Sequence, residues 1–261
     1  MRFLIICLIL VSWILMTIQA NTPVTVLQSS ETLTGSCYNF PATSFDSTNC
    51  VKCKYGSSPH FVLDVGDAAI DFTLSTLEGD EVTLSSLLEE KAVVMLWGMH
   101  TCPAFQGLGT SYPFDQSSYE HEWDVVEEYS DDFTFLHLVG PEPHPSSPEV
   151  NFDSGRIKTN YWSTIPQGYD YETRRQHGQK IASLVHPNAL LVLDDLGQSS
   201  STTSSSSVTE VTTTKMNNPV WCSYSMGART AMVVGKGGKI VYTRDWFRAE
   251  NLIEQLESMK S

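Results

Sequence analysis

The sequence predicts an α/β domain in which helices cover both faces of a largely parallel sheet. Three short apolar segments, at residues 92–97, 134–139 and 189–193, have the length and composition of buried strands. Helical patterns separate these segments, and a hairpin signal at Lys236-Gly237-Gly238 precedes a final amphipathic helix. This order of elements predicts a three-layer α/β sandwich of the thioredoxin type.

The segment before the first apolar strand predicts an N-terminal β-hairpin extension of that sheet. Residues 71–74 and 82–84 alternate apolar and polar side chains, and Gly79-Asp80 between them is a turn signal. A short helix is expected to start at residues 85–88. The remaining elements are expected as helices at 117–129, 171–185 and 249–259, and as strands at 230–234 and 240–243.

Length and charge limit the domain organisation and the partners. The chain has 261 residues, enough to bury a core, and we expect residues 61–261 to form the thioredoxin-like domain. Its 16 Lys and Arg against 30 Asp and Glu argue against nucleic acid as a partner. Residues 198–215 are rich in Ser and Thr, so this segment is interpreted as a surface insertion that buries no core.

Residues 1–20 have the pattern of a secretory signal peptide. Arg2 precedes an apolar run over residues 3–18, and Ala20 ends it with a small side chain. We therefore expect a secreted or lumenal protein in an oxidising compartment. The alternative is an uncleaved signal-anchor, the one case in which we expect contact with a membrane, although the apolar run is short for a span.

Five cysteines follow residue 20, and an odd count leaves at least one thiol outside an intramolecular disulfide. They are Cys37, Cys50, Cys53, Cys102 and Cys222. The candidate for the remaining thiol is Cys102.

Residues 21–60 read as a loop-rich extension that is held by a disulfide. Cys37 with Cys50 or Cys53 is the expected structural pair. Two alternatives are an accessory redox pair formed by Cys50 and Cys53, and a zinc site that includes His60. Because thiols oxidise in the secretory pathway, we expect no bound metal.

Cys102 lies in the loop after the strand at 92–97, where open α/β sheets place their chemistry. Pro103 suits the first position of a helix, whose N–H groups would favour a thiolate. A protonated His100 would act in the same direction. The alternative is a small buried residue without chemistry. A position after the strand, rather than within it, favours a nucleophile.

Three further residues are candidates for the same site. His144 follows the strand at 134–139, so parallel strands would bring it to the edge that carries Cys102, where it would act as an acid or base; a rigid loop residue is the alternative. Cys222 is a resolving cysteine for oxidised Cys102, or a partner of the extension. Arg229 binds an anionic group or pairs with an acidic side chain.

The loop Thr101-Cys102-Pro103-Ala104-Phe105 resembles the active site of the iodothyronine deiodinases. In that family a selenocysteine, or a cysteine in many relatives, follows Thr and precedes Pro-x-Phe. The similarity covers about residues 65–259 apart from the insertion. Its later parts are Glu142-Pro143-His144-Pro145, Ile165-Pro166-Gln167, Glu172-Thr173-Arg174, Met216-Asn217-Asn218, Arg229 and Gly238-Lys239-Ile240-Val241-Tyr242.

The resemblance implies a thioredoxin fold and an enzyme that reductively removes iodine from an aromatic small molecule. Carried over, Cys102 attacks the iodine, Thr101 and His144 take part in catalysis, and Phe105, Glu142 and Arg229 contact the substrate. It implies no bound cofactor and an external thiol, or a thioredoxin-like reductase, as reductant. The family's second histidine falls on Gly168.

Two other functions remain open from the sequence. Peroxiredoxins carry Pro-x-x-x-Thr-x-x-Cys, and here Met95 and Met99 occupy the Pro and Thr positions, whereas Arg229-Thr230 resembles the distal arginine of that family. A peroxiredoxin-like thiol peroxidase is therefore one alternative. The other is a non-catalytic interaction module with a thioredoxin fold.

Overall fold

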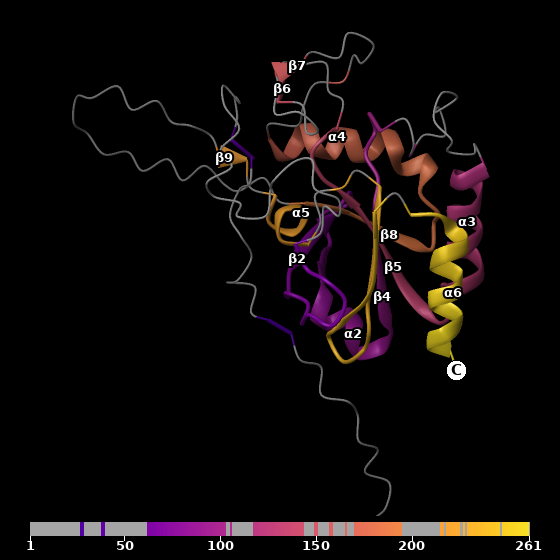
Figure 1. The fold of residues 1–261 in the computed structure, drawn as a ribbon. Coiled ribbons are helices and arrows are strands. Elements are labelled where there is room, and N and C mark those ends of the chain that lie inside the picture. Colours follow the sequence, from indigo (N-terminus) through magenta and orange to yellow (C-terminus); the bar gives the residue numbers. More distant parts are fainter. Residues whose placement is uncertain are drawn as a thin grey trace, which may run out of the picture.

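A seven-stranded mixed sheet forms the centre of the computed structural model, with the strand order β11-β10-β4-β5-β8-β2-β3 (Figure 1). Its strands are β2 (Thr73–Thr76), β3 (Glu81–Thr83), β4 (Ala92–Trp97), β5 (Phe133–Val139), β8 (Ala189–Leu193), β10 (Thr230–Val234) and β11 (Ile240–Asp245). The structure describes residues 27–28, 38–39, 62–102, 105, 117–143, 149–150, 157–158, 165, 170–194, 215–216, 218–224, 227, 229–245 and 247–260.

The three central strands β4, β5 and β8 are parallel, and antiparallel strands flank them on both sides. In β4 and β5, Ala92 pairs with Phe133 and Trp97 with Leu138. β10 runs antiparallel to β4 and forms the predicted hairpin with β11. The predicted hairpin of β2 and β3 joins the opposite edge through β8. Two short pairs lie outside this sheet: β1 (Tyr38–Asn39) with β9 (Lys215–Met216), and β6 (Glu149–Val150) with β7 (Ile157–Lys158).

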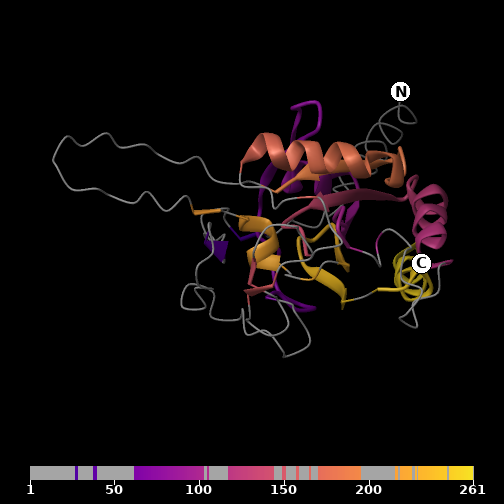
Figure 2. The ribbon, with the colours of Figure 1, turned by 90° about the horizontal axis from the view of Figure 1, so that it is seen from above.

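Helices cover both faces of the sheet and complete the three layers. They are α2 (Leu84–Glu90), α3 (Ser117–Tyr129), α4 (Tyr171–Ile181), α5 (Pro219–Tyr224) and α6 (Ala249–Lys260), with a 3₁₀ turn η2 (Ala182–Leu184) after α4. Apolar side chains of α2 and α5 share one core cluster, whereas those of α3 and α6 share another. Figures 1 and 2 both show α3 and α6 side by side and α5 away from them.

The central strand β4 is buried along its whole length because it contributes to both cores. Met95 and Trp97 face the cluster of α2 and α5, and Val94 and Leu96 face that of α3 and α6. A strand that is covered on both faces needs apolar residues at every position, and this explains the continuous apolar run in the sequence. The predicted α/β fold with an N-terminal hairpin is thereby confirmed.

Several element boundaries differ from the prediction by one or more residues, and two of these differences have a cause in the structure. The first strand begins at Thr73, because the Asp71 carboxylate accepts hydrogen bonds from the backbone N–H of Phe72 (3.0 Å) and of Ser85 (2.9 Å) in α2. Asp71 thus acts as a cap from outside the helix. The helix predicted to reach residue 185 ends at Ile181 and continues only as η2. Pro187 follows, and the residue before a proline disfavours helical geometry.

Several sequence predictions fall outside the described residues and stay predictions. These are the signal peptide, the pairing of Cys37, Cys50 and Cys53, and the insertion up to residue 214; Lys215, its expected last residue, lies in β9. Within the described ranges, no helix is long and apolar enough to cross a membrane.

Candidate active site

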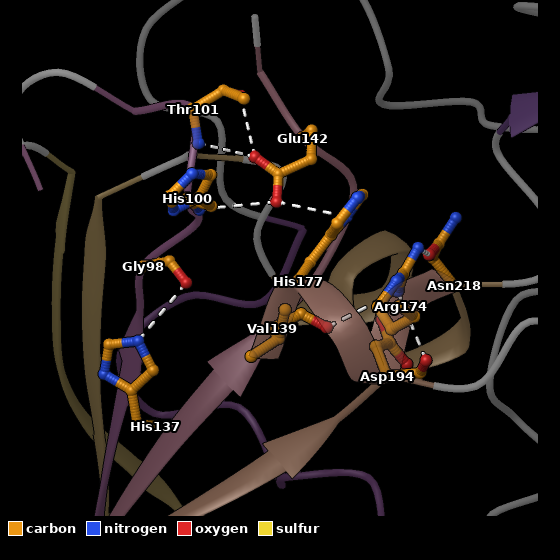
Figure 3. A network of polar contacts seen from close by, with 10 residues as sticks. All are labelled: Gly98, His100, Thr101, His137, Val139, Glu142, Arg174, His177, Asp194 and Asn218. Carbon is orange, nitrogen blue, oxygen red and sulfur yellow. Dashed lines mark hydrogen bonds and ion pairs between the residues drawn. The ribbon is translucent and has the colours of Figure 1, made fainter. Parts of the chain in front are cut away.

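The carboxyl ends of β4, β5 and β8 meet at one edge of the sheet, and polar residues follow each of them (Figure 3). Cys102 lies in the loop after β4, Glu142 follows β5, and Asp194 follows β8. Arg229 comes to the same edge because it precedes β10, which is antiparallel to β4 with Ala231 opposite Leu96. The topology therefore brings most of the predicted site together.

Cys102 combines a loop position with burial. Its backbone N–H donates to the Met99 carbonyl (3.1 Å), so the chain turns at once after β4. The side chain is only 1% exposed and packs in an apolar cluster with Phe105, Val139, Ile181 and Leu193. Attack on a substrate therefore requires this cover to open. The helix expected at Pro103 lies outside the described residues.

The carboxylate of Glu142 holds the loop that carries Cys102. Its Oε2 accepts hydrogen bonds from the Thr101 backbone N–H (2.6 Å) and hydroxyl (2.7 Å), and Oε1 lies 3.3 Å from the backbone nitrogen of His100 (Figure 3). Glu142 is fully buried. Because a buried carboxylate is costly unless several donors surround it, these contacts fix both the carboxylate and the loop. Glu142 and Thr101, predicted to contact substrate and to take part in catalysis, thus contact each other.

Burial raises the pKa of Glu142, although the bonds from Thr101, the charge of Arg174 and the contact with His100 act in the opposite direction. Desolvation disfavours the charged form of a carboxyl group, and it is the largest cause here. A raised pKa allows this group to hold a proton next to the loop of Cys102.

His177, which the sequence analysis missed, faces the second oxygen of that carboxyl group. Its Nδ1 lies 3.4 Å from Glu142 Oε1, within the range of an ion pair but too long for a good hydrogen bond. Among the described residues Nδ1 has no hydrogen-bond partner. Burial, with a smaller effect of the Arg174 charge, lowers the pKa of His177 to about 4.

The two pKa directions favour the neutral forms of Glu142 and His177. Glu142 Oε2 already accepts two short hydrogen bonds from Thr101, so a proton on neutral Glu142 belongs on Oε1. Oε1 is the oxygen that lies 3.4 Å from His177 Nδ1. A protonated Glu142 therefore carries its proton on the side of the imidazole.

Arg174 links four elements beneath this pair. Its guanidinium donates to the carbonyl of Val139 (3.4 Å), to the carbonyl of Asp194 (3.2 Å) and to Asn218 Oδ1 (2.8 Å). The Asp194 carboxylate in turn accepts from the backbone N–H groups that open α5, those of Val220 (3.2 Å) and Trp221 (2.8 Å). Arg174 is fully buried, so it joins α4, the ends of β5 and β8, and α5.

Arg229 and Phe105, both predicted to contact substrate, pack inward. The guanidinium carbon of Arg229 lies 5.0 Å from the centre of the Phe247 ring, and Nε donates to the Phe247 carbonyl (3.4 Å). The ring of Phe105 is 1% exposed and lies 5.0 Å from that of His137. Contact of either side chain with a substrate remains a prediction.

Other predicted residues cannot be placed beside Cys102. His144 lies outside the described residues, and Cys222 is described only as a backbone position in α5. A signal for Arg174 and His177 was present in the sequence, because their spacing puts them on one helix face with Ile181. Within the described ranges, no group of three or more His, Cys, Asp and Glu is arranged to hold a metal ion.

No protein-family model and no curated protein matches this chain. Solved structures similar to it include an exposed lipoprotein thioredoxin from Streptococcus pneumoniae, with 15% identity, 72% of this chain and 98% of that chain covered, and a TM-score of 0.42. A peroxidoxin from Mycobacterium tuberculosis matches with 14% identity, 76% and 99% coverage, and a TM-score of 0.42.

The thioredoxin domain of a thiol-disulfide oxidoreductase from Bacteroides vulgatus is also similar, with 15% identity, 76% and 98% coverage, and a TM-score of 0.42. At these identities and TM-scores the similarities say nothing about activity. None of these three structures is described as a deiodinase.

Proposed function

We propose that this protein is a secreted thiol-dependent oxidoreductase in which Cys102 is the nucleophile. The observation that carries the proposal is the bonding of Thr101, the neighbour of Cys102, to a buried carboxyl group that also faces a histidine. Ionisable groups that are buried around a strand-end cysteine are expensive for stability, and such groups are typical of sites where protons move. A purely structural cysteine needs none of them.

The substrate class in this proposal is an iodinated aromatic molecule, on the strength of the sequence resemblance. The Cys102 thiolate attacks iodine, the carbon–iodine bond breaks, and the aromatic carbon takes a proton. The products are the deiodinated ring and a sulfenyl iodide on Cys102. An external thiol then displaces iodide and forms a mixed disulfide, and a second thiol restores Cys102. In total, two thiols become a disulfide, and the substrate loses iodine as iodide and gains hydrogen.

In this proposal the pair of Glu142 and His177 supplies the proton. Glu142 contacts the loop of Cys102 through Thr101, and burial favours its protonated form beside His177. Positioned acid–base groups contribute roughly 10²–10⁴ in rate. His144 remains the sequence-based candidate for the same role, and it follows Glu142 by two residues.

The test compares two cysteine variants in an assay of iodide release from an iodinated phenol with dithiothreitol as reductant. Cys102→Ser should lose turnover, because the hydroxyl is a poor nucleophile towards iodine. Cys222→Ser should keep the first turnover and slow only recycling, because a resolving Cys222 would displace iodide in place of the first external thiol. Full activity of Cys102→Ser would disprove the proposal. Parallel assays with hydrogen peroxide separate a dehalogenase from a peroxidase.

The residue at position 99 argues against the peroxidase alternative. Met99 stands where peroxiredoxins have the threonine that cradles the peroxide, and it is fully buried in the core with α2 and α5. A thioether donates no hydrogen bond to a peroxide.

The burial of Cys102 favours the other alternative, a non-catalytic module. Alkylation of native protein with iodoacetamide discriminates the two: rapid modification at mildly acidic pH supports the enzyme, and an inert thiol supports the module.

A further inference from the structure

We propose that His137 is a positioning residue that fixes Gly98 and Phe105, on the two sides of Cys102 in the chain. This inference rests on the proposed role of Cys102 as nucleophile. His137 contacts Gly98, four residues before Cys102, and Phe105, three residues after it. One side chain therefore contacts the segment on both sides of the cysteine.

The contact with Gly98 is polar and defines the state of the ring. His137 Nε2 lies 3.2 Å from the Gly98 carbonyl oxygen (Figure 3). A carbonyl only accepts, so Nε2 carries the hydrogen and Nδ1 is the acceptor nitrogen of the neutral ring. Gly98 is the residue at which the chain leaves β4, because its N–H still donates to the Leu138 carbonyl (3.4 Å). The bond therefore fixes the start of the turn that leads to Cys102.

The contact with Phe105 is apolar and closes the cover over Cys102. The two rings are 5.0 Å apart and tilted by 45°, and Phe105 belongs to the cluster that buries Cys102. Both rings press on Gly98: a Cβ there would lie 2.5 Å from the Phe105 ring and 2.6 Å from His137. Only glycine fits between them, so the three residues form one packed unit.

Packing of the apolar core does not require a histidine at position 137. His137 lies in β5, a strand of otherwise mostly apolar residues, and is 1% exposed. An apolar side chain would avoid the cost of burying an imidazole. Behind the ring lies a narrow cavity of about 10 Å³, the room of about one water molecule, with Trp123, Val126 and His186 in its wall. This space allows a larger ring to replace His137.

The experiment measures alkylation of Cys102 by iodoacetamide in the native full-length chain, followed by peptide mass spectrometry. Reaction of a buried thiol reports how often its cover opens. His137→Phe keeps the ring contact and loses the bond to Gly98, whereas His137→Gln keeps a donor near the Nε2 position and loses the ring. Each variant should be alkylated about 2- to 12-fold faster, the factor that corresponds to one net hydrogen bond or ring contact. His137→Ala loses both contacts and should show roughly the product of the two factors.

His186→Gln is the matched control, because His186 lines the same cavity but makes its ring contact with Trp123 and its hydrogen bond with the backbone N–H of Asn188. It should lower the melting temperature about as much as the His137 variants and leave the alkylation rate unchanged. Equal alkylation rates in wild type and His137→Phe would overturn the proposal.

A second measurement does not depend on the folding of variants. In protein with ¹⁵N-labelled histidine, alkylation of wild-type Cys102 should shift the Nε2–H signal of His137 and leave that of His186 in place; an unmoved His137 signal would also overturn the proposal. Both readouts follow the thiol itself, so they remain valid if the protein fails to release iodide.

Discussion

Polar contacts differ between the two ends of the parallel strands: an ion pair at the amino end is exposed, and the contacts at the carboxyl end are buried. At the amino end the polar contacts lie at the surface: Lys260 pairs with Asp132 at 2.7 Å while both side chains stay 38–45% exposed. At the carboxyl end Glu142 and Arg174 are fully buried. Surface pairs contribute about 0–1 kcal/mol, whereas removing one partner from a buried pair costs about 3–5 kcal/mol. Variants at the carboxyl end are therefore expected to lose more stability than variants at the amino end.

The largest effect is expected for Arg174→Met. The variant keeps an apolar stem but removes the guanidinium donor from the Asp194 carbonyl and from Asn218 Oδ1, whereas the Val139 carbonyl keeps the backbone N–H of Asp194 (3.0 Å). The free energy of unfolding should fall by about 3–5 kcal/mol, as for other buried charged groups with broken partners. Urea denaturation measures it. A decrease of less than about 1 kcal/mol in the free energy of unfolding would show that the contacts of Arg174 do not stabilise this edge of the sheet.

The next effect concerns pH and His177. Its pKa is about 4 in the folded protein against an ordinary value of 6.5, so the unfolded chain binds more protons between these values. The stability that neutral His177 contributes is therefore present above about pH 6.5 and is lost as the pH falls towards 4. In His177→Gln, the free energy of unfolding should fall by roughly 1–3 kcal/mol less over this pH range than in the wild type.

Glu142 and His137 also contribute to the pH dependence of stability. The raised pKa of Glu142 has the opposite sign: stability declines as the pH rises from its ordinary value of 4.5 through the raised value. His137, whose pKa burial also lowers to about 4, adds to the effect of His177. Urea midpoints of wild type and His177→Gln from pH 4 to 7 isolate the contribution of His177. Parallel curves would contradict the prediction.

Glu142→Gln should be mild for stability and severe for activity. An amide oxygen can accept both Thr101 donors and the amide NH₂ can donate to His177 Nδ1, but the long bond from the His100 backbone N–H (3.3 Å) to Oε1 is lost, so the cost should be about 1–2 kcal/mol. The amide holds no transferable proton, so turnover with an iodinated phenol should fall by roughly 10²-fold or more. Glu142→Ala serves as the comparison, because it loses the loop contacts as well. Unchanged turnover in Glu142→Gln would exclude the pair as the proton source.

The smallest effect is expected at the amino end. Lys260→Met breaks the pair with Asp132, and both partners remain accessible to water. We expect the smallest change in the free energy of unfolding among these variants, and the change should shrink further in high salt. A larger loss, measured by the same urea denaturation, would remove the contrast between the two ends of the sheet.

The sequence predicted the sheet better than the site. The boundaries of β4, β8 and β10 and of α3 match the predicted ranges. Burial on both faces explains the continuous apolar runs of β4 and β10, whereas β8, predicted as a buried strand, leaves Leu190 38% exposed. The end of α4 was predicted four residues too late, since the turn η2 continues the apolar spacing. Of the site, the strand-end positions of Cys102 and Glu142 were foreseen, but the contact between Glu142 and Thr101 was not.

By itself, the sequence determined which segments are buried strands and that Cys102 follows the central one, because the side-chain pattern of a strand is set by its own residues. Only the tertiary structure decided which partners meet there. His177 and Arg174 come from a helix more than seventy residues after Cys102, and His137 reaches Gly98 from the neighbouring strand. These contacts depend on the distances between elements and on the exclusion of water. Neither of these is encoded in a local pattern of the sequence.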